Sequence, residues 1–119
     1  MPKVPQNELP SRIEAVSERD GRYRREAYFF LYAALDFTLS KMKAPRHVTG
    51  RELLIGISEY ARKEYGPMVK LVFECWGISQ TEDFGNIVFL LVEAGLMGKT
   101  QEDRIEDFRN VYEFDEEFG

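Results

Sequence analysis

The chain has 119 residues, of which 44% are hydrophobic and 31% charged, and its formal net charge is −5. This length suits one domain, and this composition predicts a globular fold rather than a disordered chain. The single cysteine, Cys75, excludes a disulfide framework within the chain and a cysteine-based metal site. We therefore expect a core built from apolar side chains alone.

Residues 1–10 include three prolines and no apolar segment, so we expect a flexible N-terminal arm there and no signal peptide. Residues 11–119 are predicted to form a single helical domain. The longest apolar runs, AYFFLYAAL and IVFLLV, are too short to span a bilayer. We expect no membrane association and a cytoplasmic location, which agrees with the single thiol.

The first predicted helix lies in the segment SRIEAVSER. Ser11 is a candidate N-cap, and Ile13 and Val16 are three residues apart, as on one face of a helix. Asp20 and Gly21 then form a turn signal. A short helix that ends at these two residues is predicted.

Residues 24–43 form the strongest helix prediction. The segment is apolar on nearly every face from Ala27 to Leu35, which indicates a central, largely buried helix. Asp36 is the only charge between Ala27 and Leu39, so we expect it to be exposed or held in a structural pair. Pro45 marks the loop that follows.

The segment VTGRELLIGISEYARKEYG opens with Thr49 and Glu52 in the T-x-x-E spacing of a capping box. Gly66 and Pro67 end this helix and begin the next one. Between these boundaries, apolar residues at helical spacing predict one buried stripe: Leu53, Leu54, Ile57 and Ala61.

The following helix, PMVKLVFECW, has only two charged residues, Lys70 and Glu74, which are four apart on one stripe. Because its other residues are apolar or small, we expect this helix to be covered on most sides. Cys75 is accordingly predicted to pack in the core. Gly77 ends the helix.

The segment WGISQTEDFGNIVFLLVEAGL has the layout of the second half of a helix-turn-helix. Ser79 and Glu82 have the spacing of a second capping box, and Gly95 is a natural helix end. Reading a duplex requires basic or amide side chains that reach bases and phosphates. The outward positions instead include three acids and no Lys or Arg, so we interpret this helix as scaffold: Gln80, Glu82, Asp83, Asn86 and Glu93.

The C-terminal segment leaves two alternatives open for residues 96–114. GLMGKT and NVYEF are two short strands of a wing, or Thr100 caps a short helix through Phe108 that precedes an extended tail. The predicted fold class is therefore mainly α, a compact single domain of four to five helices with a helix-turn-helix-like core. Its variant is winged-helix-like, with a short C-terminal β-hairpin.

Five segments are distinctive in combination: RREAYFF, HVTGRELLIGI, YGPMVKLVFECWGI, TEDFGNIVFLLVEAGLMGKT and EDFRNVYEFDEEF. Together they resemble a family of small uncharacterised bacterial proteins, over nearly the whole chain from residue 11 to residue 118. The family has no established activity, substrate or catalytic residue. The resemblance therefore implies a bacterial cytoplasmic setting and no particular chemistry.

No catalytic or metal-binding pattern is evident. His47 is the only histidine, and no Ser or Cys nucleophile has a discernible relation to it. The acids of the C-terminal segment lack the alternate spacing and glycine turn of a calcium loop, and we interpret them as a solvated acidic face. Phosphate-binding, dinucleotide and hydrolase motifs are not found. We expect no cofactor, no metal and no enzymatic activity.

Charge is divided unevenly along the chain. Residues 41–63 include six basic residues and two acids, whereas residues 64–119 include four basic residues and thirteen acids. The preferred hypothesis is a non-enzymatic adaptor or regulatory module that binds a protein partner or forms a homo-oligomer. The alternative is nucleic-acid binding through the basic block at 41–51, disfavoured because the acidic half would repel a polyanion. Its weak candidate binding residues are Lys41, Lys43, Arg46, His47 and Arg51.

Overall fold

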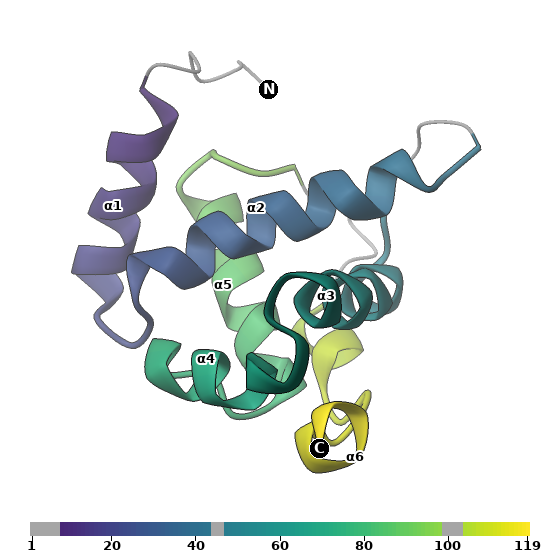
Figure 1. The fold of residues 1–119 in the computed structure, drawn as a ribbon. Helices are drawn as coiled ribbons and strands as arrows, with labels where there is room; N and C mark the ends of the chain where they lie inside the picture. The colour runs from purple at the N-terminus through teal and green to yellow at the C-terminus, as the bar shows by residue number, and fades with distance from the viewer. Residues whose placement is uncertain (1–7, 44–46, 99–103) are drawn as a thin grey trace.

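Helices make up most of the described part of the chain, which covers residues 8–43, 47–98 and 104–119 of the computed structural model. The radius of gyration is 13.7 Å, close to the roughly 13.5 Å of a compact domain of this length. The mainly α prediction is confirmed. In chain order the longer helices are α1 (Leu9–Asp20), α2 (Arg25–Ser40), α3 (Gly50–Tyr65), α4 (Val69–Trp76) and α5 (Thr81–Glu93) (Figure 1).

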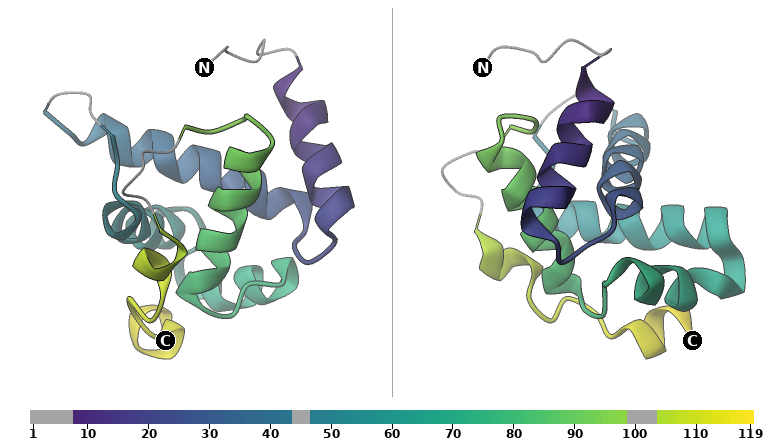
Figure 2. Two further views of the ribbon diagram at one scale, coloured as in Figure 1. Left: turned by 180° about the vertical axis from the view of Figure 1, so that it is seen from behind. Right: turned by 90° about the vertical axis from the view of Figure 1, so that its left-hand side faces the viewer.

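Three short helical segments complete the described chain. A 3₁₀ turn, η1 (Gly66–Met68), joins α3 to α4, and a second, η2 (Ile105–Phe108), follows α5. The last segment is α6 (Phe114–Phe118), which lies below α3 and α4 in Figure 1. The rear view in Figure 2 shows α5 in the middle, with α1 on one side and α3 and η2 on the other.

Helix α1 begins earlier than predicted. Its first residue is Leu9 and Pro10 lies in its first turn, where a missing amide hydrogen is tolerated. Ser11 is therefore not the N-cap, and its hydroxyl instead donates to the carbonyl of Glu8 at 3.0 Å. The predicted end is confirmed, since Gly21 adopts a left-handed conformation with φ of 77°. Most of the predicted arm, residues 1–7, lies outside the described residues.

Helix α2 has the buried character that its composition predicts. It contacts α1, α3, α4 and α5. Asp36 is exposed, which is one of the two predicted alternatives for this residue. The contact of α2 with α3 is tight at Gly56, which faces Thr38. The side chains of α2 in the core are Ala27, Tyr28, Phe30, Leu31, Ala34 and Thr38.

Two of the predicted helix boundaries in the middle of the chain can be compared directly with the structure. The capping box at the start of α3 is confirmed, because the amide of Glu52 donates to the Thr49 hydroxyl at 3.1 Å and the Thr49 amide donates to Glu52 Oε1 at 3.0 Å. The capping box at the start of α5 is displaced by one residue. The carboxylate of Asp83, not of Glu82, accepts from the amides of Ser79 and Gln80, at 2.8 and 3.1 Å.

The predicted C-terminal β-hairpin is wrong for the described residues, because residues 104–119 contain no strand. The hydroxyl of Thr81 at the start of α5 donates to the carbonyl of Phe108 and accepts from the amide of Val111. Val111 belongs to the predicted strand NVYEF, and its amide is used by Thr81 instead of by a second strand. Phe114 and Phe118 are four residues apart, which suits a helical turn. Thr100, the alternative cap, lies outside the described residues.

The C-terminal residues 112–118, which include α6, are held against α3 and α4 by ring contacts and by a hydrogen bond. Phe114 and Phe118 each lie 5.6 Å from the ring of Phe73, measured between centroids. The hydroxyl of Tyr112 donates to the carbonyl of Leu54 at 2.8 Å. The underside of α3 and part of α4 are therefore covered by the C-terminal residues.

Candidate functional site

Helix α4 has an apolar face toward the core and a second apolar face toward solvent. Val69 and Phe73 are fully buried and Trp76 is 9% exposed. Leu71 is 52% exposed, Met68 just before the helix is 50% exposed, and Cys75 is exposed. The prediction that this helix is covered on most sides, with Cys75 in the core, is wrong.

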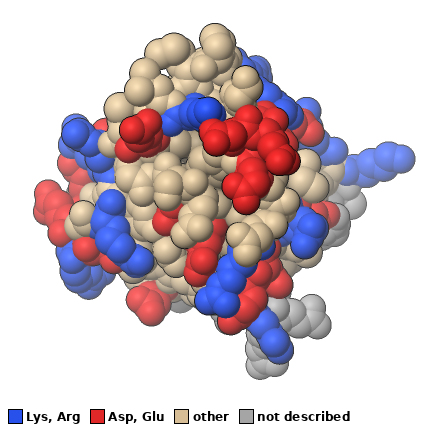
Figure 3. All heavy atoms as spheres, turned by 90° about the horizontal axis from the view of Figure 1, so that it is seen from below, with Lys and Arg blue, Asp and Glu red and all other residues tan. Residues whose placement is uncertain are grey.

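The outer face of α4 follows from helical geometry. At about 100° per residue, Leu71 lies roughly 140–160° around the helix from each of the three buried residues. Met68 and Cys75, three before and four after Leu71, lie on the same side. We call Met68, Leu71 and Cys75 the α4 face. The view from below in Figure 3 shows extended uncharged surface beside a group of acidic side chains.

Charged residues border the α4 face along one edge. Lys70 and Glu74 lie on that edge, one helical turn apart, and both are exposed. The Lys70 ammonium lies 2.8 Å from the Asp115 carboxylate of α6. This hydrogen bond and the charge of Lys70 lower the pKa of Asp115. Lys70 thus pairs with α6 at the edge of the α4 face.

The basic block does not form a converging cationic surface in the described residues. Lys41 Nζ lies 2.8 Å from Glu59 Oε2 and 4.6 Å from the centre of the Phe37 ring, so its charge is shared within the fold. Lys43 is exposed after the end of α2, and Arg51 is exposed on the first turn of α3. Arg46 lies outside the described residues.

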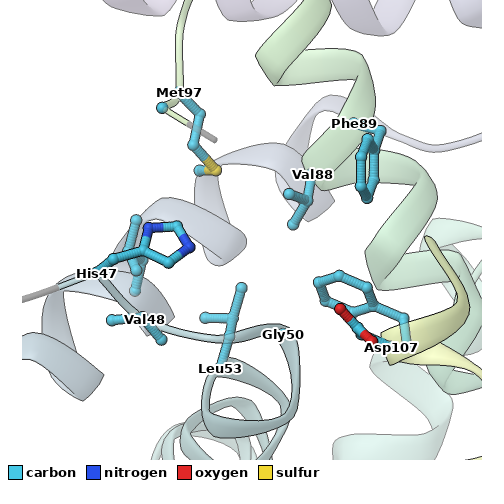
Figure 4. A pocket seen from close by; sticks show the side chains of 11 residues that line it. His47, Val48, Gly50, Leu53, Val88, Phe89, Met97 and Asp107 are labelled. Carbon is cyan, nitrogen blue, oxygen red and sulfur yellow. The ribbon is translucent and has the colours of Figure 1, made fainter. Parts of the chain in front are cut away.

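His47 lines a small pocket between the start of α3, α5 and η2. Figure 4 shows its imidazole and the Asp107 carboxylate on opposite sides of this pocket, with apolar side chains between them. The cavity volume is about 80 Å³, roughly half that of a cavity that holds benzene. The pocket has room for one small apolar group. Sequence reasoning missed that His47 and Asp107 line the same pocket, since nothing in their separation of 60 positions indicates it.

The polar side chains at the start of α5 are used within the fold. The hydroxyl of Tyr23 donates to Asp83 Oδ1 at 2.7 Å and accepts from Asn86 Nδ2 at 2.9 Å. Burial raises the pKa of Tyr23 to about 12. Glu82 pairs with Arg109 at 3.2 Å. These side chains therefore support the fold at positions where a recognition helix would present them to nucleic acid.

Metal and membrane sites were also considered for the part of the chain that the structure describes. Within it, no group of three or more His, Cys, Asp or Glu residues is arranged to hold a metal ion. Over the same residues, every helix is too short or too polar to cross a bilayer.

Comparison with known proteins identifies no relative. No protein-family model, curated protein or solved structure matches the chain. The resemblance to small uncharacterised bacterial proteins therefore stays a prediction.

Proposed function

We propose that the protein is a cytoplasmic, non-enzymatic interaction module that binds a protein through the α4 face. The observation that carries this proposal is the exposure of Leu71 at the outermost position of α4, with Met68 and Cys75 beside it. Single exposed apolar residues are ordinary on protein surfaces. Three at the spacing i, i+3 and i+7 form the stripe by which helices dock on protein partners.

The close packing of the inner face of α4 supports this assignment. Its inner residue Phe73 lies 5.2 Å from the Phe84 ring and 5.6 Å from the Phe30 ring, between centroids. The ring of Trp76 lies 5.4 Å from that of Phe30. A surface that is already held in its binding conformation loses less conformational entropy on association.

We propose that α4, the turn after it and α5 form a helix-turn-helix-like core that acts as a scaffold. Gly77 has a φ of 88°, and the amide of Ile78 donates to the carbonyl of Phe73 at 2.9 Å, which closes the turn tightly. In this proposal α5 is the buried support and α4 is the helix presented to a partner. Nucleic-acid binding through residues 41–51 remains the alternative, and the pairing of Lys41 with Glu59 weakens it.

The proposal is tested by capturing partners from a bacterial lysate with tagged wild-type protein, Leu71→Glu and Ile55→Glu. Ile55 is the matched control, because it is also 52% exposed but lies on α3. We expect proteins captured by the wild type and by Ile55→Glu to be lost with Leu71→Glu, and to survive nuclease treatment. Equal capture by Leu71→Glu contradicts the proposal. Capture that nuclease abolishes supports the alternative instead.

A further inference from the structure

We propose that the partner of the α4 face is a second copy of this chain, with the two α4 helices packed antiparallel about a two-fold axis. The inference rests on the function proposed above and specifies it further. Most soluble oligomers are symmetric homo-oligomers, and a two-fold interface requires a surface that is complementary to itself. The α4 face and its charged edge meet this requirement.

The charges provide the first part of the argument. Lys70 and Glu74 are four residues apart on the same edge of α4. In an antiparallel pair centred on residue 72, position 70 of each helix lies opposite position 74 of the other. A two-fold axis perpendicular to both helices keeps these edges on the same side. Two Lys–Glu pairs then form across the interface. A parallel pair about a two-fold axis along the helices would instead place the two charged edges on opposite sides of the interface, where they could not pair.

The apolar residues are consistent with the same centre. Pairing Met68 of one copy with Cys75 of the other places the axis midway between residues 71 and 72, within half a residue of the centre that the charges require. Leu71 then lies next to the axis in both copies. Leu71 and Met68 are 52% and 50% exposed, so each copy has apolar surface to bury there.

The contact between Lys70 and Asp115 is compatible with this pairing. A lysine ammonium has three hydrogens to donate, so Lys70 can serve Asp115 of its own chain and Glu74 of the second copy. Asp115 is 89% exposed, so this ion pair is weak and leaves Lys70 able to reach Glu74 of the second copy. Because three apolar side chains per copy make a small interface, the dimer should be weak, with its population rising between about 10 µM and about 1 mM.

Sedimentation equilibrium at low salt tests the pairing. The apparent mass of the wild type should rise with concentration from 13.9 kDa toward twice that value. Leu71→Glu should stay at the monomer mass over the whole range, whereas Ile55→Glu should behave as the wild type. Far-ultraviolet circular dichroism confirms that each variant is folded.

A charge exchange tests the orientation. Lys70→Glu alone and Glu74→Lys alone each place like charges across the axis, and each should weaken the dimer by roughly tenfold or more. The double variant Lys70→Glu/Glu74→Lys should restore it. Asp115→Asn is the control for the lost contact with α6, and it should leave the dimer nearly unchanged.

The outcomes separate this inference from the proposed function. If the double variant dimerises as weakly as the single variants, the antiparallel pairing is overturned. A wild type that is monomeric at every concentration overturns the second copy as partner. If Leu71→Glu nevertheless loses captured proteins in that case, the α4 face still binds a different protein and only the present inference fails. Both fail together if Leu71→Glu changes neither mass nor capture.

Discussion

Replacing Gly56 by alanine should destabilise the fold, because this residue of α3 lies directly against Thr38 of α2. A Cβ at position 56 would lie 3.0 Å from the Cβ and 3.3 Å from the Cγ2 of Thr38, and would overlap the Thr38 hydroxyl. That hydroxyl is buried and donates to the carbonyl of Ala34 at 2.7 Å. It therefore has little freedom to move away.

The expected magnitude follows from two opposing contributions. Overpacking a core contact costs about 1–3 kcal/mol, and alanine stabilises a helix interior by up to about 1 kcal/mol relative to glycine. Because the added Cβ would overlap a buried hydroxyl, the overpacking cost should lie at the upper end of its range, and Gly56→Ala should lower the free energy of unfolding by about 2 kcal/mol. Urea denaturation followed by circular dichroism measures this change, provided that the slope of the transition is preserved.

Two further variants complete the test. Thr38→Ala removes both the hydroxyl and Cγ2, so Gly56→Ala should be less destabilising in that background, as a double-mutant cycle would show. Gly98→Ala is the control, because an added Cβ has nothing within 4 Å there, and it should change stability by less than about 0.5 kcal/mol. A Gly56→Ala protein as stable as the wild type would refute the argument.

Three other predictions concern hydroxyl and thiol groups. Tyr112→Phe removes the hydrogen bond to Leu54 and should lower the unfolding free energy by about 1 kcal/mol in urea denaturation; an unchanged midpoint would contradict this. Burial raises the pKa of Tyr28 and Tyr32 to about 12, whereas unfolded phenols titrate near 10, so stability should be full below about pH 10 and fall between about pH 10 and 12. Phenolate absorbance reports the titration of these tyrosines directly. A free energy of unfolding that stays constant between about pH 10 and 12 would disprove the prediction. At low protein concentration, the Cys75 thiol should react with a thiol reagent in the native protein. If this thiol reacts only after unfolding, the outward placement of this side of α4 is wrong.

Most helix boundaries could be predicted because local chemistry determines them. Thr49 and Glu52 satisfy each other's backbone amides without help from the rest of the chain. Gly21 and Gly77 adopt left-handed conformations that other residues avoid. The displaced cap of α5 has a different origin. Asp83 also binds Tyr23, which is 60 residues away, and this tertiary contact selects Asp83 over Glu82.

The candidate site could not be predicted because α4 is apolar on both sides. Phe73 and Leu71 are equally suited to a core by composition, and only the rings of Phe30 and Phe84 decide which one is buried. The predicted binding residue Lys41 shows the same limit. Its partner Glu59 is 18 residues further along the chain. Lys41 is therefore paired only because α2 packs on α3, which the sequence does not reveal.

The most direct test of the α4 face is a dilution series of isotope-labelled protein, followed by backbone amide NMR. Raising the concentration should move or broaden the signals of Met68 to Trp76, and the signals around Ile55 on α3 should stay constant. Leu71→Glu should abolish the changes. Concentration-dependent changes centred on another surface, or none at all at high concentration, would contradict self-association through α4.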